Sequence, residues 1–577
     1  VIPFLFLTSR ANNRIIKDQY YHIACDLLSG LMLKMGCKPF DQMPFVTSLI
    51  EHNPKLHDLF DCIDSADREH ELLARKITNN IETKGKLYTP REEIAGFDDI
   101  DALMQTYNNN LYFGHKPQRL LEDYKGHIYI NGYENNTVRI INIIKDLTGT
   151  GIQNYTASID AWLPQSEVDD PVEKAPALRK MFDSSSVSLI YGAAGTGKTT
   201  LIKHVSNYFH DASKLYLANT NTAVNNLERN ISVKNTTFST VYSFCNNQRI
   251  DTEYDLLIID ECSTISNEDM LKVLRKASFK YLILVGDTYQ IEAIRYGNWF
   301  SAVRSFMPDS SVIELTRPFR TKNENLLTLW NKVRNLDDDI LEHITKNDNR
   351  YSSVLNESVL DSTDNDEIIL CLNYDGLYGI NNINRFLQGN NPNKEVTWWV
   401  HTYKVSDPVL FNESRRFMPS IYNNQKGNIV NIDIKENRIW FDIELDKIIT
   451  GFDAAISNLQ LVGNSKDGNS IVRFHVDSPP DTDNDDSDAS TATVPFQVSY
   501  AVSIHKAQGL EYNSVKVVIA NETEEMITHN IFYTAITRTK EKLKIYWSAE
   551  TEKKVLEGLE KRDSRKDVSL LAAKFSL

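Results

Sequence analysis

Cysteine is scarce in this chain of 577 residues, and its placement excludes two kinds of site. The six cysteines are scattered, none forms a CxxC pair, and none has a second ligand at zinc-finger spacing. Isolated thiols of this kind are typical of small buried side chains in a reducing compartment. Long apolar runs are missing as well, because no stretch approaches the ~18 residues that a membrane span requires. We therefore expect a cytoplasmic protein without a disulfide framework or a membrane segment.

Positive charge is in deficit. The chain has 63 Lys and Arg residues against 78 Asp and Glu residues, so its formal net charge is −15. This balance excludes a polybasic protein that coats nucleic acid through bulk charge, but it permits a local basic groove. The hydrophobic share of 41% is that of a globular protein, and the length predicts several domains of about 150 residues each.

Residues 1–165 carry no recognisable catalytic pattern. Thr89 followed by Pro90 predicts a helix start, and Val138 lies in a short run that predicts a strand. We expect a mostly helical accessory region of unknown role, which offers a surface to a protein partner. Because the chain begins with Val1 rather than Met, we also expect that an effector can precede this region. Apolar residues recur at helical spacing in three of its stretches, 18–38, 44–64 and 65–82.

The pattern changes after the polar, acidic segment 166–176, which predicts a linker. From Val187 onward, short apolar runs alternate with helical stretches, which predicts parallel strands buried on both faces in doubly wound α/β layers. Within 405–495 the runs alternate in polarity instead, and they predict a small β-barrel insertion. The acidic stretch Asp481–Asp486 lacks the glycine of a calcium loop, so 477–490 is predicted to be a solvated loop.

The strongest local signal is the segment Gly192-Ala-Ala-Gly-Thr-Gly-Lys198-Thr199, which follows an apolar run and precedes a helical stretch. In this GxxxxGK[ST] pattern the glycines let backbone N–H groups approach phosphates, Lys198 neutralises β/γ charge, and the Thr199 hydroxyl can hold Mg²⁺. ATP and Mg²⁺ are therefore the expected cofactors. The expected nucleotide-binding residues of the loop are Gly192, Gly195, Thr196, Gly197, Lys198, Thr199 and Thr200.

Two further apolar runs end in polar residues. The run 256–259 ends in Asp260 and Glu261. Asp260 can hold Mg²⁺, and Glu261 can orient and deprotonate an attacking water. Downstream of a P-loop this pair indicates hydrolysis, because a kinase has no use for a water-activating Glu. The run that ends in Leu284 and Val285 leads to Gln290, which can contact the γ-phosphate.

Three distant segments supply arginines and polar side chains. They are 315–320, 503–511 and 533–540. Arginines from a second α/β domain can complete the charge clamp on a transferring phosphoryl group, which is typically worth roughly 10³–10⁵ in rate. Such a site forms only when two domains close, so hydrolysis would be coupled to a cycle of closing and opening.

Taken in order, these segments resemble the motif set of superfamily 1 helicases. The segments His505-Lys-Ala-Gln-Gly509 and Tyr533-Thr-Ala-Ile-Thr-Arg538 are most similar to the RecD/Dda-like branch. The resemblance covers residues 180–550. It implies an ATP-dependent helicase or translocase that moves on single-stranded DNA, with 5′ to 3′ as the expected direction.

The resemblance also implies a division of the chain. It implies two RecA-like doubly wound parallel-sheet domains, with an SH3-like β insertion in the second and the mostly helical region in front. The predicted units are 1–165, accessory region; 166–320, ATP-binding RecA-like domain 1A; 321–404, first part of RecA-like domain 2A; 405–495, SH3-like β insertion; 496–550, second part of domain 2A; and 551–577, C-terminal tail or helix.

Carried over residue by residue, the resemblance adds roles outside the P-loop. Gln290, Arg320 and Arg538 would contact the γ-phosphate, and Glu511 would lie near the ribose. Tyr242 lies beside a predicted strand contact and is itself a candidate for stacking on a base, a contact worth ~1–3 kcal/mol. The residues implied to lie along a single strand of nucleic acid are Asn219, Thr220, Thr240, Ser503 and His505.

Departures from the family pattern keep alternatives open. Gln290 is not followed by two prolines, the stretch between Phe238 and Asp255 leaves little room for a strand-separating hairpin, and the adenine-reading Gln has only Gln165 as a distant candidate. The first alternative is an RNA helicase of the same superfamily. The second is a nucleic-acid-gated ATPase that remodels or signals, for example in anti-phage defence, without processive unwinding.

Overall fold

The computed structural model describes residues 68–577 with gaps, and it also places two strands nearer the N-terminus, β1 (Ile23–Cys25) and β2 (Leu31–Leu33), which pair with each other. These strands lie inside stretch 18–38, so the helix predicted there is wrong. The helix predicted for 44–64 lies outside the described residues. The gaps fall at 83, 248–251, 294–295, 346–350, 362–363, 365, 400, 413–415, 419, 436, 479–492, 522–526, 561–563 and 576–577.

The first α/β layer, here called lobe 1, is a six-stranded sheet in which every pairing is parallel. Its apolar strands alternate their side chains between two cores: Ile258 packs on one face of the sheet, and Leu257 packs on the other. A parallel sheet covered by helices on both faces requires such continuous apolar runs, which is why the sequence predicted this layer. In spatial order its strands are β11 (Val312–Leu315), β6 (Val187–Gly192), β10 (Ser278–Gly286), β9 (Glu253–Ile259), β7 (Lys214–Ala218) and β8 (Thr236–Thr240).

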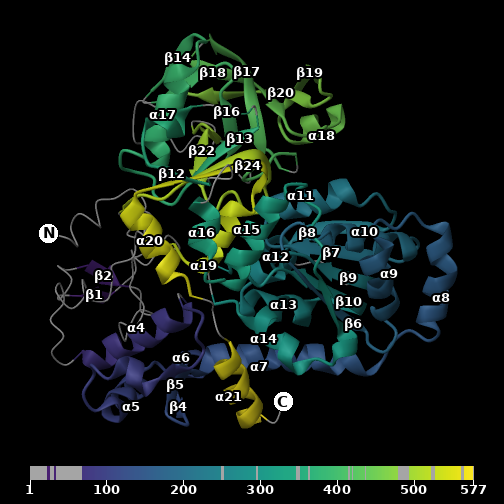
Figure 1. The fold of residues 1–577 in the computed structure, drawn as a ribbon, viewed down its shortest axis with the longest axis vertical. Helices are drawn as coiled ribbons and strands as arrows, with labels where there is room; N and C mark the ends of the chain where they lie inside the picture. The colour runs from purple at the N-terminus through teal and green to yellow at the C-terminus, as the bar shows by residue number, and fades with distance from the viewer. Residues whose placement is uncertain are drawn as a thin grey trace.

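Helices pack on this sheet (Figure 1). Helices such as α10 begin at its carboxyl edge, where the strands end. Lobe 1 carries α9 (Pro171–Lys180), α10 (Lys198–Tyr208), α11 (Asn221–Asn230), α12 (Val241–Asn246), α13 (Asn267–Lys276) and α14 (Trp299–Val303). Helix α9 begins inside the predicted linker 166–176, so that segment is only partly a connection.

The second layer, lobe 2, is a five-stranded parallel sheet assembled from two separated parts of the chain. The chain enters it before the β insertion and returns to it afterwards. The two parallel sheets confirm the predicted fold class. The strands in spatial order are β12 (Ser352–Val354), β24 (Thr539–Trp547), β23 (Tyr512–Val518), β13 (Glu367–Cys371) and β22 (Ala501–Ser503); the helices are α15 (Glu324–Asn335), α16 (Ile340–Thr345), α17 (Ile380–Asn390), α19 (His529–Ile536) and α20 (Ala549–Gly558).

The insertion is a six-stranded antiparallel sheet built around the aromatic side chains Phe411, Phe441, Phe474 and Phe496. Its SH3-like character stays a prediction, and most of the predicted acidic loop 477–490 lies outside the described residues. A hairpin of β14 (Glu395–Trp398) and β15 (His401–Lys404) precedes the sheet. In spatial order the strands are β19 (Gln460–Asn464), β20 (Ser470–Asp477), β18 (Arg438–Leu445), β17 (Lys426–Lys435), β16 (Pro408–Phe411) and β21 (Phe496–Val498), with α18 (Gly451–Ile456) at one end.

Residues 68–165, here called the N-terminal block, are mostly helical around a small antiparallel sheet. The helix start predicted at Thr89 is wrong: Thr89 and Pro90 form strand β3, and the short 3₁₀-helix Arg91–Ile94 that follows has no side-chain cap. Val138 lies inside helix α7 rather than in a strand. The other elements of the block are α4 (Glu69–Glu82), α5 (Ile100–Asn110), α6 (Lys116–Arg119), β4 (Leu121–Tyr124), β5 (His127–Ile130), α7 (Asn131–Asp146) and α8 (Tyr155–Trp162).

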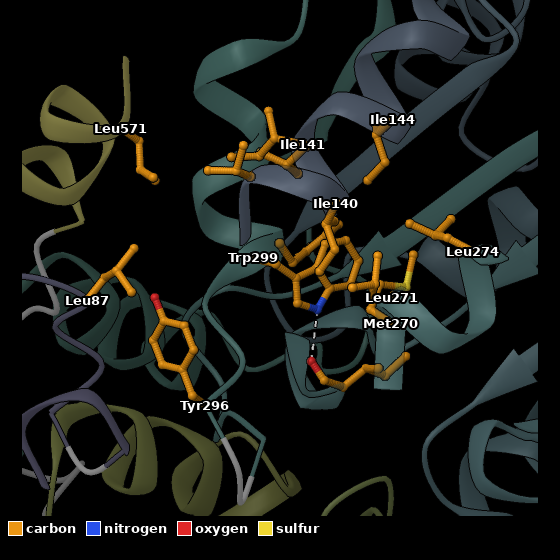
Figure 2. Packing of buried hydrophobic residues seen from close by; sticks show 14 of the residues in the cluster. Leu87, Ile140, Ile141, Ile144, Met270, Leu271, Leu274, Tyr296, Trp299 and Leu571 are labelled. Atoms are coloured by element: carbon orange, nitrogen blue, oxygen red, sulfur yellow. Dashed lines mark hydrogen bonds between the residues drawn. The ribbon is translucent and has the colours of Figure 1, made fainter. Parts of the chain in front are cut away.

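The N-terminal block shares one hydrophobic core with lobe 1 (Figure 2). Ile140 and Ile141 of α7 are fully buried in the same cluster as Leu271 of α13 and Trp299 of α14. The Trp299 indole N–H donates to the Ile265 carbonyl at 2.8 Å. Because large buried aromatic and aliphatic side chains dominate packing energy, this shared core holds the block against lobe 1.

The C-terminal helix α21 (Arg565–Phe575) docks on the same block. The buried carboxylate of Asp567 accepts the backbone N–H groups of Leu87 at 2.9 Å and Tyr88 at 3.2 Å. Leu571 is fully buried in the shared core, and Lys574 pairs with the buried carboxylate of Glu134 at 2.8 Å. The C-terminal helix α21 therefore returns to the N-terminal block, where Figure 1 shows it beside α7.

Replacing Asp567 with Ala should destabilise this junction by about 1–3 kcal/mol, because two buried N–H groups would lose their acceptor. Asp567→Asn retains one acceptor oxygen and should cost less. Chemical denaturation followed by tryptophan fluorescence measures the loss, and limited proteolysis should release α21 first. Equal unfolding midpoints for the wild type and Asp567→Ala would contradict this account of the docking.

Among the described residues, no helix combines the length and apolar character needed to cross a bilayer.

Candidate active site

The glycine-rich loop connects β6 to α10 at the carboxyl edge of lobe 1. Gly195 and Gly197 have left-handed φ values of 77° and 78°, which side-chain-bearing residues rarely adopt. A Cβ on Gly195 would lie 2.5 Å from the Cβ of Arg320. The loop therefore needs glycine both for its turn and for the close approach of Arg320.

Lys198 opens helix α10 and folds back over the loop. Its ammonium donates to the carbonyls of Gly192 at 2.9 Å and Ala193 at 3.0 Å. These hydrogen bonds hold the positive charge of Lys198 next to the glycine-rich loop. The Thr196 hydroxyl also donates to Ala193 O, at 2.9 Å, so a contact of Thr196 with nucleotide would come from its backbone. Thr199 and Thr200 follow in the first turn of α10, where the helix dipole favours anions.

Asp260 and Glu261 lie directly after β9. Asp260 is 8% exposed, and one of its oxygens accepts the Glu261 N–H at 2.8 Å. Burial, reinforced by the charge of Glu261, raises the pKa of Asp260 to about 7. A buried carboxylate of this kind, together with the Thr199 hydroxyl in the first turn of α10, would fit Mg²⁺, which takes few protein oxygens and completes its shell with water and phosphate.

This raised pKa makes a prediction for the protein without metal or nucleotide. The folded state holds a proton on Asp260 that the unfolded state, with the ordinary value of 3.8, has released. The free energy of unfolding should therefore decrease as the pH rises from about 4 through about 7. Denaturation of the wild type and of Asp260→Asn across this pH range measures the effect, because the variant lacks it. Parallel curves would contradict the raised pKa.

Gln290 is buried near Asp287 at the end of β10. Its side-chain N–H lies 3.4 Å from Asp287 Oδ2, and its Oε1 is buried without a hydrogen-bond partner among the described residues. Asp287 also accepts from the Tyr533 hydroxyl at 3.4 Å, and that hydroxyl accepts from the P-loop N–H of Ala194 at 3.3 Å. Tyr533 of lobe 2 thus reaches the phosphate loop of lobe 1. Both Tyr533 and Asp287 stand inside predicted motifs, but nothing local in the sequence indicated that they meet.

The two predicted arginines lie close together where lobe 2 contacts the phosphate loop of lobe 1. Arg320 donates to the Thr537 carbonyl at 2.7 Å. Arg538 is 2% exposed and donates from Nε to the Thr534 carbonyl at 3.0 Å. Burial and the charge of Arg320 lower the pKa of Arg538 to about 10, so the guanidinium remains charged near neutral pH. The charge of Glu261 acts in the opposite direction, which indicates that the candidate base lies close to this arginine.

Glu511, predicted near a ribose, is engaged by cations. It forms an ion pair with Arg320 at 2.6 Å and a longer one with Lys540 at 3.8 Å. Burial alone would raise the pKa of Glu511, but the charges of Arg320, Arg538 and Lys540 outweigh burial and lower it. Glu511 therefore positions Arg320 in this structure, and its contact with ribose stays a prediction.

The predicted strand contacts divide into two groups. In the first group the side chain already has a structural partner. Asn219 donates to Thr264 O at 2.7 Å, Thr220 and Thr240 cap α11 and α12, and Ser503 accepts the Lys506 N–H at 3.2 Å. In the second group, Tyr242 is 74% exposed on α12, and His505 is exposed. Asn219 is exposed as well, but its amide is held by Thr264, so Tyr242 and His505 are the exposed contacts without such a hydrogen bond among the described residues.

A cavity of about 540 Å³ adjoins the first turn of α10. Its lining includes Gln165, Trp162 and Thr200, so the distant adenine candidate lies beside the nucleotide loop. No sequence pattern indicated a role for Lys174, which lies nearby in the predicted linker. Its ammonium is buried, pairs with Asp169 and lies 5.1 Å from the ring centroid of Phe319.

Comparisons with known proteins agree with the two-lobed site. An AAA domain family model matches residues 172–350, and a UvrD-like helicase C-terminal domain model matches 498–546. An uncharacterized protein of Methanocaldococcus jannaschii is 23% identical over 62% of this chain and 36% of its own length. The RecBCD enzyme subunit RecD of Buchnera aphidicola subsp. Schizaphis graminum is 21% identical over 51% of this chain and 54% of its own length. The chain thus spans about a third to a half of these curated relatives.

Two helicases are among the solved structures that align with this chain. Pif1 helicase from Candida albicans aligns with a TM-score of 0.43 at 16% identity, over 69% of this chain and 97% of its own. Pif1 helicase from Bacteroides, in complex with ADP-AlF3 and ssDNA, aligns with a TM-score of 0.43 at 15% identity, over 71% of this chain and 98% of its own.

Proposed function

Starting from the relationship to superfamily 1 helicases of the RecD-like branch, which the two matched family models and the RecD relatives support, we propose that this chain hydrolyses ATP between its lobes. Hydrolysis drives its movement along single-stranded DNA, 5′ to 3′. The domains that carry this activity are 166–320 and, interrupted by the insertion 405–495, 321–404 and 496–550. A cytoplasmic location and a protein partner for residues 1–165 belong to the same proposal.

One observation carries this proposal: groups from both sides of the cleft converge on the phosphate loop. Arg320 packs against Gly195, Tyr533 of lobe 2 contacts Ala194, and Arg538 follows the same lobe 2 helix, α19. A bound triphosphate would therefore hold the lobes together, and its cleavage would weaken that link. A cycle of this kind converts chemistry into relative movement of two domains.

Each residue of the site has a distinct role in the proposed reaction. The loop N–H groups and Lys198 bind the β- and γ-phosphates, while Thr199 and Asp260 would hold Mg²⁺, which supplies charge neutralisation on the phosphates. Glu261 orients the attacking water and accepts its proton. Gln290 fixes the water and γ-phosphate geometry from its place beside Asp287. Arg320 and Arg538 stabilise the charge that develops on the transferred phosphoryl group.

The choice of DNA over RNA rests on the His505–Gly509 segment and on the RecD relatives, whereas the Asn219–Val224 segment also resembles RNA helicases. We expect poly(dT) to stimulate ATP hydrolysis more strongly than poly(U) at equal nucleotide concentration. Steady-state ATPase assays with both polymers test this. Stronger stimulation by poly(U) would favour the RNA alternative.

A second candidate, a nucleic-acid-gated ATPase without processive unwinding, is favoured by one structural observation. Between β8 and β9 the described residues hold only the six-residue helix α12, which leaves no described hairpin to split a duplex. A strand-displacement assay separates the two functions. Full DNA-stimulated hydrolysis without displacement would support the gated ATPase.

A further inference from the structure

A cavity away from the phosphate loop lies at the seam between the N-terminal block and lobe 1. It has a volume of about 690 Å³, and its walls come from α4, α6 and α7 of the block and from α13 of lobe 1. Figure 1 shows α6 and α7 along the side of lobe 1 where α13 lies. The walls are fixed to each other, because Asn267 of α13 donates to the Thr137 hydroxyl of α7 at 2.8 Å.

Cations outnumber carboxylates around this cavity. The acidic members are already engaged: Glu82 accepts the Tyr133 hydroxyl at 2.5 Å, and Glu268 pairs with Lys272 at 2.6 Å. Arg139 and Arg275 are exposed at the cavity and have neither an ion-pair nor a hydrogen-bond partner within the part of the chain that the structure describes. The chain as a whole has a net charge of −15, so a cavity with two such guanidinium groups is a local region of positive charge.

The chemistry of the lining fits phosphate groups. A guanidinium group presents N–H donors in a planar fork that matches phosphate oxygens. The amide side chains of Asn136 and Gln118 line the same space and add donors. The lining tyrosines, Tyr133 and Tyr296, pack edge to face with ring centroids 5.4 Å apart. The cavity therefore offers a backbone-binding surface rather than a platform for bases.

Helix α13 connects this cavity to the predicted strand contacts. Its N-terminus follows Thr264, whose carbonyl holds Asn219, and its side packs on α12, which carries the exposed Tyr242. The ammonium of Lys276, at the end of α13, donates to the Cys245 carbonyl of α12 at 2.9 Å. Ten residues of helix span about 15 Å, so a strand bound at α12 can continue to the cavity within a few nucleotides.

We propose that this cavity binds the phosphodiester backbone of single-stranded DNA that extends beyond the predicted strand contacts around Tyr242, with Arg139 and Arg275 as the phosphate-binding residues. The inference rests on the proposed strand-binding function. It assigns the N-terminal block a role as the second wall of an extended, sequence-independent binding path.

The test compares two lengths of DNA on the full chain. An oligo(dT) of about eight nucleotides would cover the predicted strand contacts alone, and one of about thirty nucleotides would also reach the cavity. Fluorescence anisotropy gives the dissociation constants over a range of salt concentrations. The variant is Arg139→Gln/Arg275→Gln, and the control is Arg385→Gln/Lys394→Gln, which removes two exposed charges from lobe 2.

For the long oligonucleotide, the Arg139→Gln/Arg275→Gln variant should show a salt slope shallower by about 1.4, since each single-strand phosphate contact contributes ~0.7. That slope corresponds to about 25-fold weaker binding near ~0.1 M salt. The short oligonucleotide should bind the wild type, the variant and the control equally.

Equal salt slopes for the wild type and the variant with the long oligonucleotide would overturn the proposal. The cavity would then be a candidate for a contact with a protein instead. A parallel loss in the Arg385→Gln/Lys394→Gln control would overturn it too, because the effect would then be one of net charge. If the wild type fails to bind the short oligonucleotide, the proposed function itself fails, while the long-oligonucleotide comparison still decides the cavity.

Discussion

Replacing Glu261 with Gln is expected to lower kcat for ATP hydrolysis by about 10²–10⁴-fold and to leave nucleotide affinity nearly unchanged. Glu261 lies two residues after Ile259, the last residue of β9, and has a left-handed φ of 52°. Its Oε2 atom is buried and has no hydrogen-bond partner among the described residues, so it is available to accept a proton from water.

Glutamine retains the shape of this side chain and its hydrogen-bonding reach, but it cannot accept the proton. Steady-state hydrolysis and the binding of a fluorescent nucleotide should therefore respond differently to Glu261→Gln. Lys198→Ala provides the contrast, because it removes a phosphate-binding charge and should weaken binding as well as turnover. Retained turnover in Glu261→Gln would show that another group is the base.

Arg538→Ala should lower kcat by roughly 10³–10⁵-fold with a much smaller change in nucleotide affinity, because an arginine clamp acts mainly on charge that develops in the transition state. The guanidinium is fully enclosed at the lobe interface, where a charge–charge interaction is stronger than in water. Its pKa of about 10 keeps it charged at neutral pH despite burial and the neighbouring Arg320.

Two controls separate this role from a structural one. Arg538→Lys retains a positive charge but loses the donors that reach the Leu510 carbonyl and the Thr537 hydroxyl, both at 3.4 Å, so it should recover part of the rate. The unfolding midpoint reports whether removing a buried side chain has loosened the lobe interface. Equal losses of turnover and nucleotide affinity in Arg538→Ala would argue against transition-state stabilisation.

Secondary structure was predicted wrongly from the sequence at positions where the same residues suit two conformations. Thr89 and Pro90 fit a helix start, but pairing with β5 places them in a strand. The segment 166–176 is polar enough for a linker, yet Pro171 is well suited to the first position of helix α9, and Lys174 is buried there. In each case contacts with distant parts of the chain, rather than local propensity, selected the conformation.

The phosphate loop, the Asp260–Glu261 pair and the buried parallel strands could be predicted from local pattern, because each depends on residues that are neighbours along the chain. Which groups meet between the lobes could be seen only in the folded chain: Tyr533 contacts Ala194, and Arg320 pairs with Glu511. The docking of α21 onto the N-terminal block likewise became visible only there. Such contacts join residues hundreds of positions apart, and their energy comes from burial and hydrogen bonds that exist only after the lobes have packed.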